Sequence, residues 1–118
     1  SLEDLARHRC LCVYNHYYGR LVHWQFLDAK GEAQDWQPPQ SVTFVSGDPL
    51  IEGSLAGLGV AQVMAFAVRA HIQSGRLVHL LPEFEGRSRE LSLVYPRARQ
   101  ASPKIKVLTQ LLLQQCCW

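Results

Sequence analysis

The chain has 118 residues, of which 47% are hydrophobic and 19% are charged, and its formal net charge is +2. One domain is expected at this length, because such a chain buries roughly two thirds of its unfolded surface. The composition excludes an intrinsically disordered chain, and no run of about 18 apolar residues is present to span a membrane. No apolar secretory signal opens the sequence, so the expected compartment is the cytoplasm.

The first half of the chain is predicted to begin with a short helix and continue with strands. Ser1 and Asp4 match a capping box, in which a side chain and a backbone N–H pair at the start of a helix. Gly31 ends a hairpin turn that starts at Asp28, and two prolines at 38 and 39 end the hairpin itself. The expected strands, from apolar and aromatic runs, are 10–14, 22–27, 32–36 and 41–45.

Helices and strands alternate in the second half. Asp48 is the expected N-cap of a helix with Pro49 at its first position, and glycines at 57 and 59 are expected to end it. The later predicted elements are a strand over 60–64, a helix over 65–74, strands over 77–81 and 91–95, and a helix from 103. Alternation of this kind over 41–81 is typical of parallel β-α-β units. The predicted fold class is therefore α/β.

No motif indicates a cofactor, a metal or a catalytic residue. The cysteines stand at 10 and 12 and at 116 and 117, which is neither the C-x-x-C spacing of zinc sites nor a favourable disulfide geometry. The glycines at 53, 57 and 59 depart from the dinucleotide pattern G-x-G-x-x-G, so they are predicted to pack and end a helix. The five histidines form no pair at helical spacing. An enzyme is not expected.

A basic segment lies near the C-terminal end. It holds six cations and one acid, Glu90, so its local charge is +5; the cations are Arg87, Arg89, Arg97, Arg99, Lys104 and Lys106. Clustered cations can neutralise phosphates, so contact with nucleic acid is one interpretation. A solvated surface is the other, and it is favoured because no aromatic platform accompanies the charges.

The junctions between strands and helices are the expected place for a ligand. Ligands of open α/β sheets collect outside the carboxyl ends of the strands, where helix N-termini present free N–H groups. Ser46 and Gly47 follow one predicted strand and could donate hydrogen bonds to a small molecule. Met64 and Phe66 follow the next strand and could supply an apolar surface. These four residues are the predicted effector-binding positions.

Several longer runs resemble the effector-binding domain of LysR-type transcriptional regulators. The runs are LAGLGVAQVMAF from Leu55, IQSGRLVHLLPEF from Ile72, LSLVYPRARQASPKIKVLTQLL from Leu91, EDLARHRCL from Glu3, and the W-x-F pattern at Trp24. Their order and spacing together are specific, and they cover nearly the whole chain. The sequence departs from the family at Met64, where proline is usual.

The resemblance implies a regulatory domain with the architecture of type 2 periplasmic binding proteins. Residues 1–86 would form most of subdomain II, and residues 87–118 the returning crossover strand and last helix of an incomplete subdomain I. A small-molecule effector would bind between the subdomains. Operator DNA would be bound only through a winged helix-turn-helix that precedes Ser1 in complete members.

The resemblance also implies a homo-oligomer, since the family packs subdomain I of one chain against subdomain II of another. A predicted apolar helix face would lack its usual cover, which favours self-association or fraying; the face consists of Ile105, Leu108, Leu111 and Leu112. Two alternatives stay open at this point. One is a stand-alone solute-binding module, and the other is an association fragment of the same fold that binds no ligand.

Overall fold

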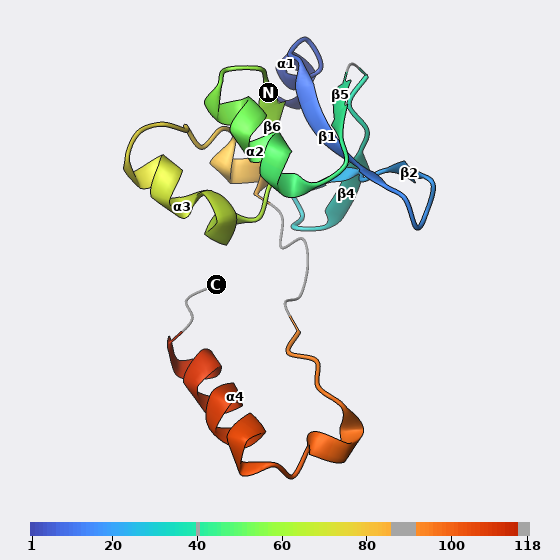
Figure 1. Ribbon diagram of the computed structural model, residues 1–118. Coiled ribbons are helices and arrows are strands. Elements are labelled where there is room, and N and C mark those ends of the chain that lie inside the picture. The colour runs from blue at the N-terminus through green and yellow to red at the C-terminus, as the bar shows by residue number, and fades with distance from the viewer. Residues whose placement is uncertain (40, 86–91, 116–118) are drawn as a thin grey trace. The chain divides into compact units, whose positions relative to one another are not determined.

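The computed structural model describes residues 1–39, 41–85 and 92–115, which fall into two compact units, Ser1–Ser88 and Arg89–Trp118. In chain order the first unit contains α1 (Leu2–Leu5), β1 (Cys10–Asn15), β2 (Arg20–Leu21), β3 (Trp24–Leu27), β4 (Ala33–Trp36), β5 (Ser41–Phe44), α2 (Gly47–Leu55), β6 (Val60–Ala61), α3 (Ala65–Gln73) and a 3-10 helix, η1 (Pro82–Phe84). The second contains a 3-10 helix, η2 (Arg97–Arg99), and α4 (Pro103–Gln115) (Figure 1). Helices and strands mix in the first unit, which confirms the predicted α/β class.

Strand β1 is the centre of the main sheet. It pairs in parallel with β5, from Cys10 opposite Ser41 to Val13 opposite Phe44. It also pairs in parallel with β6 through Cys10 and Leu11, and antiparallel with β2 near its end. The predicted parallel pairing is therefore present, but the strand that joins β5 and β6 is β1, from the start of the chain.

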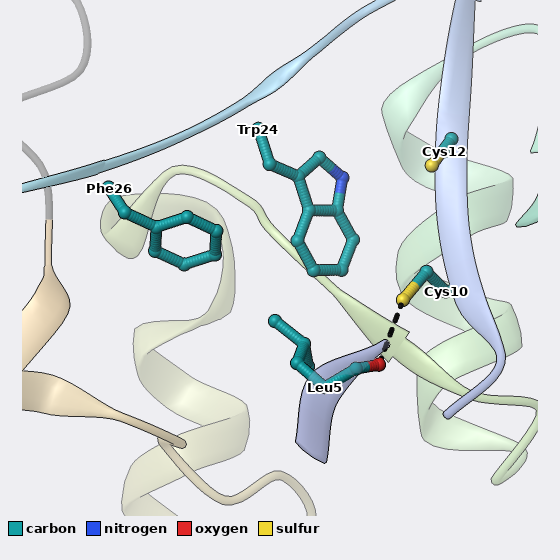
Figure 2. Packing of buried hydrophobic residues seen from close by; sticks show 5 residues of the cluster. All are labelled: Leu5, Cys10, Cys12, Trp24 and Phe26. Atoms are coloured by element: carbon teal, nitrogen blue, oxygen red, sulfur yellow. Dashed lines mark hydrogen bonds between the residues drawn. The ribbon is translucent and has the colours of Figure 1, made fainter. Parts of the chain in front are cut away.

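The core of the first unit lies between β1, β3 and α1. Figure 2 shows Leu5, Cys10, Cys12, Trp24 and Phe26 gathered there, and all five are buried. The thiol of Cys10 donates a weak hydrogen bond to the Leu5 carbonyl at 3.8 Å. Two free cysteines inside an apolar cluster behave as small apolar side chains, as their placement in an apolar run predicts.

Close packing explains two glycines of helix α2 and the turn after it. A Cβ at Gly53 would lie 3.1 Å from the ring of Phe44, so the glycine lets α2 approach the sheet. A Cβ at Gly59 would lie 2.3 Å from the carbonyl oxygen of Arg9, which accepts the N–H of Val60 in the β1–β6 pairing. Gly57 ends the helix with a positive φ of 77°. The packing and termination roles predicted for these glycines are confirmed.

Two predicted strands are absent. Residues 77–81 lie within the described part of the chain and form no strand. Both edges of β1 are already occupied, by β5 on one side and by β6 and β2 on the other, and residues 77–81 pair with none of these strands. Leu81 has a left-handed φ of 52° before Pro82, which also interrupts an extended run. Residues 92–95 form no strand either, and Leu91 lies outside the described residues.

The described part of unit 2 contains the 3-10 helix η2 and helix α4. Helix α4 begins at Pro103, as the Ser102-Pro103 pair predicts, and runs for 13 residues. None of its residues is buried, and its large apolar side chains include four that are exposed: Val107, Leu108, Leu111 and Leu113. Within the described residues, no helix of either unit is long and apolar enough to cross a membrane.

Candidate functional site

The candidate site lies at the carboxyl edge of the parallel strands. Because β5 and β6 flank β1, the helices that follow them, α2 and α3, begin at the same edge of the sheet. The last paired residue of β5 is Phe44, opposite Val13, and that of β6 is Ala61, opposite Leu11. The two strand ends therefore lie about 10 Å apart across the sheet and about 7 Å apart along it.

Ser46 and Gly47 form the start of helix α2. Ser46 is the N-cap, with extended φ and ψ of −155° and 170°, and its hydroxyl makes no capping hydrogen bond. Gly47 is the first helical residue, it is exposed, and no atom lies within 4 Å of where its Cβ would stand. The first N–H groups of a helix have no partner inside the helix, so those of α2 can donate to a ligand oxygen.

The prediction that Asp48 caps α2 is wrong. The helix begins at Gly47, so Asp48 is its second residue and its carboxylate caps no N–H group there. Proline is tolerated throughout the first helical turn, because the N–H that it lacks would be unbonded anyway. The chain can therefore enter the helix before Pro49. The exposed Asp48 carboxylate still adds negative charge beside the candidate site.

Met64 and Phe66 form the start of helix α3. Met64 is its N-cap, with φ of −67° and ψ of 132°, and it has no polar group with which to cap the helix. Phe66 is the second helical residue and is 48% exposed, whereas Val68, one half-turn on, is buried and anchors the helix. The structure thus supplies apolar surface at the start of a second helix, whose N-cap side chain makes no capping hydrogen bond.

The four predicted residues occupy two places rather than one. Ser46 and Gly47 follow β5, whereas Met64 and Phe66 follow β6, so the two pairs stand on opposite sides of β1 at one edge of the sheet. The open hollow that the structure shows in unit 2 is lined by residues between Tyr95 and Gln110 and includes none of the four. Their joint role in binding stays a prediction.

Gln62 is a residue of this region that the sequence did not single out. Its side-chain Oε1 accepts the N–H of Gln25 at 2.8 Å, and its Nε2 donates to the carbonyl of Gln25 at 2.7 Å. A single amide side chain thereby supplies the two hydrogen bonds that the backbone of a neighbouring strand would otherwise make with Gln25 of β3. The predicted strand over 60–64 accordingly ends at Ala61. Nothing local could signal this, because the partners are 37 residues apart.

The titratable side chains described by the structure do not form a metal site. Within residues 1–39, 41–85 and 92–115, no three histidine, cysteine or acidic side chains converge. Burial raises the pKa of both Cys10 and Cys12, which favours the neutral thiol over the metal-binding thiolate. Cys116 and Cys117 lie outside the described residues. His23 lies 4.0 Å from Asp35 on the exposed face of the β3–β4 hairpin.

The basic segment is exposed where it is described. Arg97, Arg99, Lys104 and Lys106 are all exposed, and none forms an ion pair with another described residue. Arg87, Arg89 and Glu90 lie outside the described residues. The two interpretations of this segment, a solvated surface and a contact with nucleic acid, therefore stay open.

Comparison with known proteins identifies the family. The profile of the LysR substrate binding domain matches residues 1–117. The chain is 37% identical over 112 residues to the HTH-type transcriptional regulator YhjC of Escherichia coli, covering 95% of this chain and 37% of that protein. It is 30% identical over 116 residues to the HTH-type transcriptional regulator CrgA of Neisseria meningitidis, covering 98% of this chain and 38% of that protein.

A third relative is the HTH-type transcriptional activator TtdR of Escherichia coli, with 26% identity over 118 residues, 98% of this chain and 36% of that protein. The chain thus spans between 36% and 38% of the length of these relatives. All three are transcriptional regulators by name and none is an enzyme. Because the family profile matches residues 1–117 of this chain, the chain belongs to the LysR substrate-binding domain family.

Proposed function

We propose that the chain is the effector-sensing part of a LysR-type transcriptional regulator and acts by binding a small molecule rather than by catalysis. The observation that carries the proposal is the pair of helices that begin at one edge of the parallel strands. Ser46 and Gly47 supply polar donors, and Met64 and Phe66 supply apolar surface. A small carboxylate with an apolar part matches both.

The ligand's polar end is expected to be an oxygen acceptor. Helix N-termini favour negative charge, and the unused hydroxyl of Ser46 adds one more donor beside α2. The exposed Asp48 carboxylate opposes a dianion at the same place. One carboxylate or carbonyl oxygen at α2, with an apolar portion toward α3, therefore suits the site better than a strongly anionic group.

In this proposal residues 1–86 form most of subdomain II, and residues 87–118 contribute the returning segment and the last helix to an incomplete subdomain I. The effector binds between the subdomains in the cytoplasm. It must bind one hinge or assembly state more tightly than another, because equal affinity shifts no equilibrium. The regulator works as a homo-oligomer and contacts operator DNA through a winged helix-turn-helix. Relatives are named both activators and repressors, so the direction of regulation stays open.

The test is a nuclear magnetic resonance titration of the isotope-labelled chain with two probes, hexanoate and acetate. Hexanoate carries an apolar tail and acetate does not. We expect Ser46→Ala to weaken both by about threefold to tenfold, the loss of one hydrogen bond. Phe66→Ala should weaken hexanoate alone. Ser74→Ala and Ile72→Ala are matched controls at the other end of α3, and both should leave the affinities within about twofold of wild type.

The outcomes separate the proposal from its alternatives. Saturable binding that responds to Ser46 and Phe66 but not to their controls supports an effector site at this edge. If none of the four substitutions changes the affinity for either probe, the proposed site is wrong. If neither probe nor a wider panel of carboxylates perturbs the chain, a ligand-free association fragment becomes the better interpretation. A stand-alone solute-binding module is distinguished in the full-length protein, which in that case would bind the ligand but no operator DNA.

A further inference from the structure

Strand β3 has two different neighbours along its length. On one side it pairs antiparallel with β4, from Trp24 opposite Trp36 to Leu27 opposite Ala33. Elsewhere it receives the amide of Gln62 at Gln25 and an isolated antiparallel bridge from Glu85 at Phe26. Segments that are distant in sequence thus converge on two consecutive residues of one strand.

Each segment leads to another part of the chain. Gln62 stands two residues before Met64 and four before Phe66, so it fixes the backbone that enters helix α3. Glu85 is the last residue described before position 92, and the chain continues from it into unit 2. Gln25 and Phe26 are adjacent, so a movement of β3 at one position moves the other.

The amide of Gln62 is suited to this position because it offers one donor and one acceptor in a plane, as a backbone peptide does. Both bonds are short, 2.7 and 2.8 Å, and both are partly shielded from solvent. Without the side chain, the N–H and carbonyl of Gln25 would lose their partners on this edge, because β6 ends at Ala61 and does not reach β3. No other described side chain makes this contact.

We propose that Gln62 is a positioning residue that holds segment 63–66 on strand β3, and that β3 links this segment to the connection starting at Glu85. The inference rests on the proposed function, since it treats segment 63–66 as the effector-facing part of α3. A ligand that displaces Met64 and Phe66 would pull on Gln62 and, through Gln25 and Phe26, alter the bridge to Glu85.

Two substitutions at one position test the proposal. Gln62→Leu keeps the approximate volume and removes both hydrogen bonds. Gln62→Glu restores both when protonated, because a carboxylic acid has one donor and one acceptor, and loses the donor when ionised. Gln73→Leu, at the exposed end of α3, is the matched control. A glutamate titrates near pH 4.3 when unperturbed, so samples at about pH 3.3 and about pH 7.5 lie well below and well above that pKa.

Other titratable groups lie close to the same strand and must be controlled for. Asp35 accepts from the Gln25 side chain at 3.0 Å, His23 lies 4.0 Å from Asp35, and Glu85 bridges to Phe26. All three are present in wild type, in Gln62→Leu and in Gln73→Leu, so their own titrations appear equally in every series. Only the behaviour that is specific to Gln62→Glu reports the group at position 62.

The readouts are amide exchange at Gln25 and the resonances of Met64, Phe66 and Glu85. At pH 7.5, Gln62→Leu should speed exchange of the Gln25 N–H by at least about tenfold and shift the other three together. At pH 7.5 Gln62→Glu keeps the acceptor for the Gln25 N–H but not the donor, so it should shift the resonances of Met64, Phe66 and Glu85 toward those of Gln62→Leu. It should return to the wild-type resonances, recorded at the same pH, at about pH 3.3. Gln73→Leu should leave all four unchanged. Rescue by protonation would not follow from a general loss of stability.

Contrary outcomes are distinct. If Gln62→Leu changes Gln25 alone while Met64, Phe66 and Glu85 keep their resonances, the proposed linkage is wrong. Hexanoate titration of the same samples separates this from the proposed function. If hexanoate binds wild type and Gln62→Leu equally, Gln62 does not position the effector site although the site exists. If hexanoate binds neither, the proposed effector site fails, while the resonances of Met64 and Glu85 still decide whether Gln62 holds the segment.

Discussion

Gly59 is the position at which a single methyl group should do most damage to the sheet. In Gly59→Ala the new Cβ would stand 2.3 Å from the carbonyl oxygen of Arg9 and 3.1 Å from Cδ2 of Leu11. The leucine side chain can turn away, but the oxygen belongs to the backbone. A carbon and an oxygen without a covalent bond need about 3.3 Å, so the two backbones must separate by about 1 Å.

That separation breaks the start of the β1–β6 pairing. The N–H of Val60 donates to the same Arg9 oxygen at 2.9 Å, and an added 1 Å removes this bond. Losing this hydrogen bond costs about 0.5–1.5 kcal/mol, and forced overpacking costs about 1–3 kcal/mol more. We expect Gly59→Ala to lower the free energy of unfolding by about 1.5–4.5 kcal/mol, a large share of the 5–15 kcal/mol typical of a domain.

The assay is urea unfolding followed by tryptophan fluorescence, which reports the environment of the buried Trp24. Gly47→Ala is the matched control, because its Cβ would meet nothing within 4 Å and alanine favours the helix by about 1 kcal/mol or less. The control should be as stable as wild type or slightly more so. A Gly59→Ala variant within about 0.5 kcal/mol of wild type would show that the close approach to Arg9 is not a constraint.

Three further predictions concern the core and the β3–β4 hairpin. Trp24→Ala removes the centre of the aromatic cluster and should cost about 3–5 kcal/mol in the same unfolding assay. Cys10 and Cys12 should react with a thiol reagent only after unfolding, and because burial raises their pKa values, stability should fall as pH rises above the ordinary thiol pKa. Hydrogen bonds lower the pKa of Asp28, and the bond from the N–H of Glu32 has the largest effect. The contribution of the Asp28 carboxylate to stability is therefore present above the ordinary carboxyl pKa and is lost as pH falls through the lowered value. The stability difference between wild type and Asp28→Asn, measured by thermal unfolding, should accordingly shrink on acidification from pH 7 to about pH 2.

Elements whose signals are local were predictable from the sequence. The capping box of Ser1 and Asp4 is present as expected, because both partners lie within one helical turn. The Asp28 turn is likewise self-contained: its carboxylate accepts the N–H groups of Lys30 and Glu32, and Gly31 takes a φ of 81°. Neither feature needs information from another part of the chain.

Elements that depend on distant partners were not predictable in the same way. An apolar run over 77–81 satisfies the pattern of a buried strand, but a strand also needs a partner to pair with, and this run pairs with none of the described strands. The position of β1 between β5 and β6 joins residues about 30 and 50 positions apart. Strand pairing at such separations is specified by packing in three dimensions. The alternation of strands and helices along one sequence does not predict which strands become neighbours.

The candidate site shows the same division. The ends of the strands, and thus Ser46 and Met64, follow from the order of strands and helices, which is a local property. Whether Asp48 caps its helix depends on where the backbone leaves the extended conformation. In the structure the N-cap is Ser46, two residues before the predicted one. Gln62 could not be found from spacing at all. Its role requires knowing that β6 stops short of β3 and that Gln25 faces it.

The exposed apolar face of α4 leads to a final prediction. A helix of 13 residues is marginal in water unless packing supports it, and no residue of α4 is buried. Leu108 is 44% and Leu111 50% exposed. Association between copies would cover this face, so amide exchange in α4 should be fast in dilute solution and should slow as protein concentration rises, while α2, anchored by the buried Leu50, stays constant. Strong, concentration-independent protection of residues 103–115 in a species that sediments as a monomer would contradict this, since the helix would then be stable without a second copy.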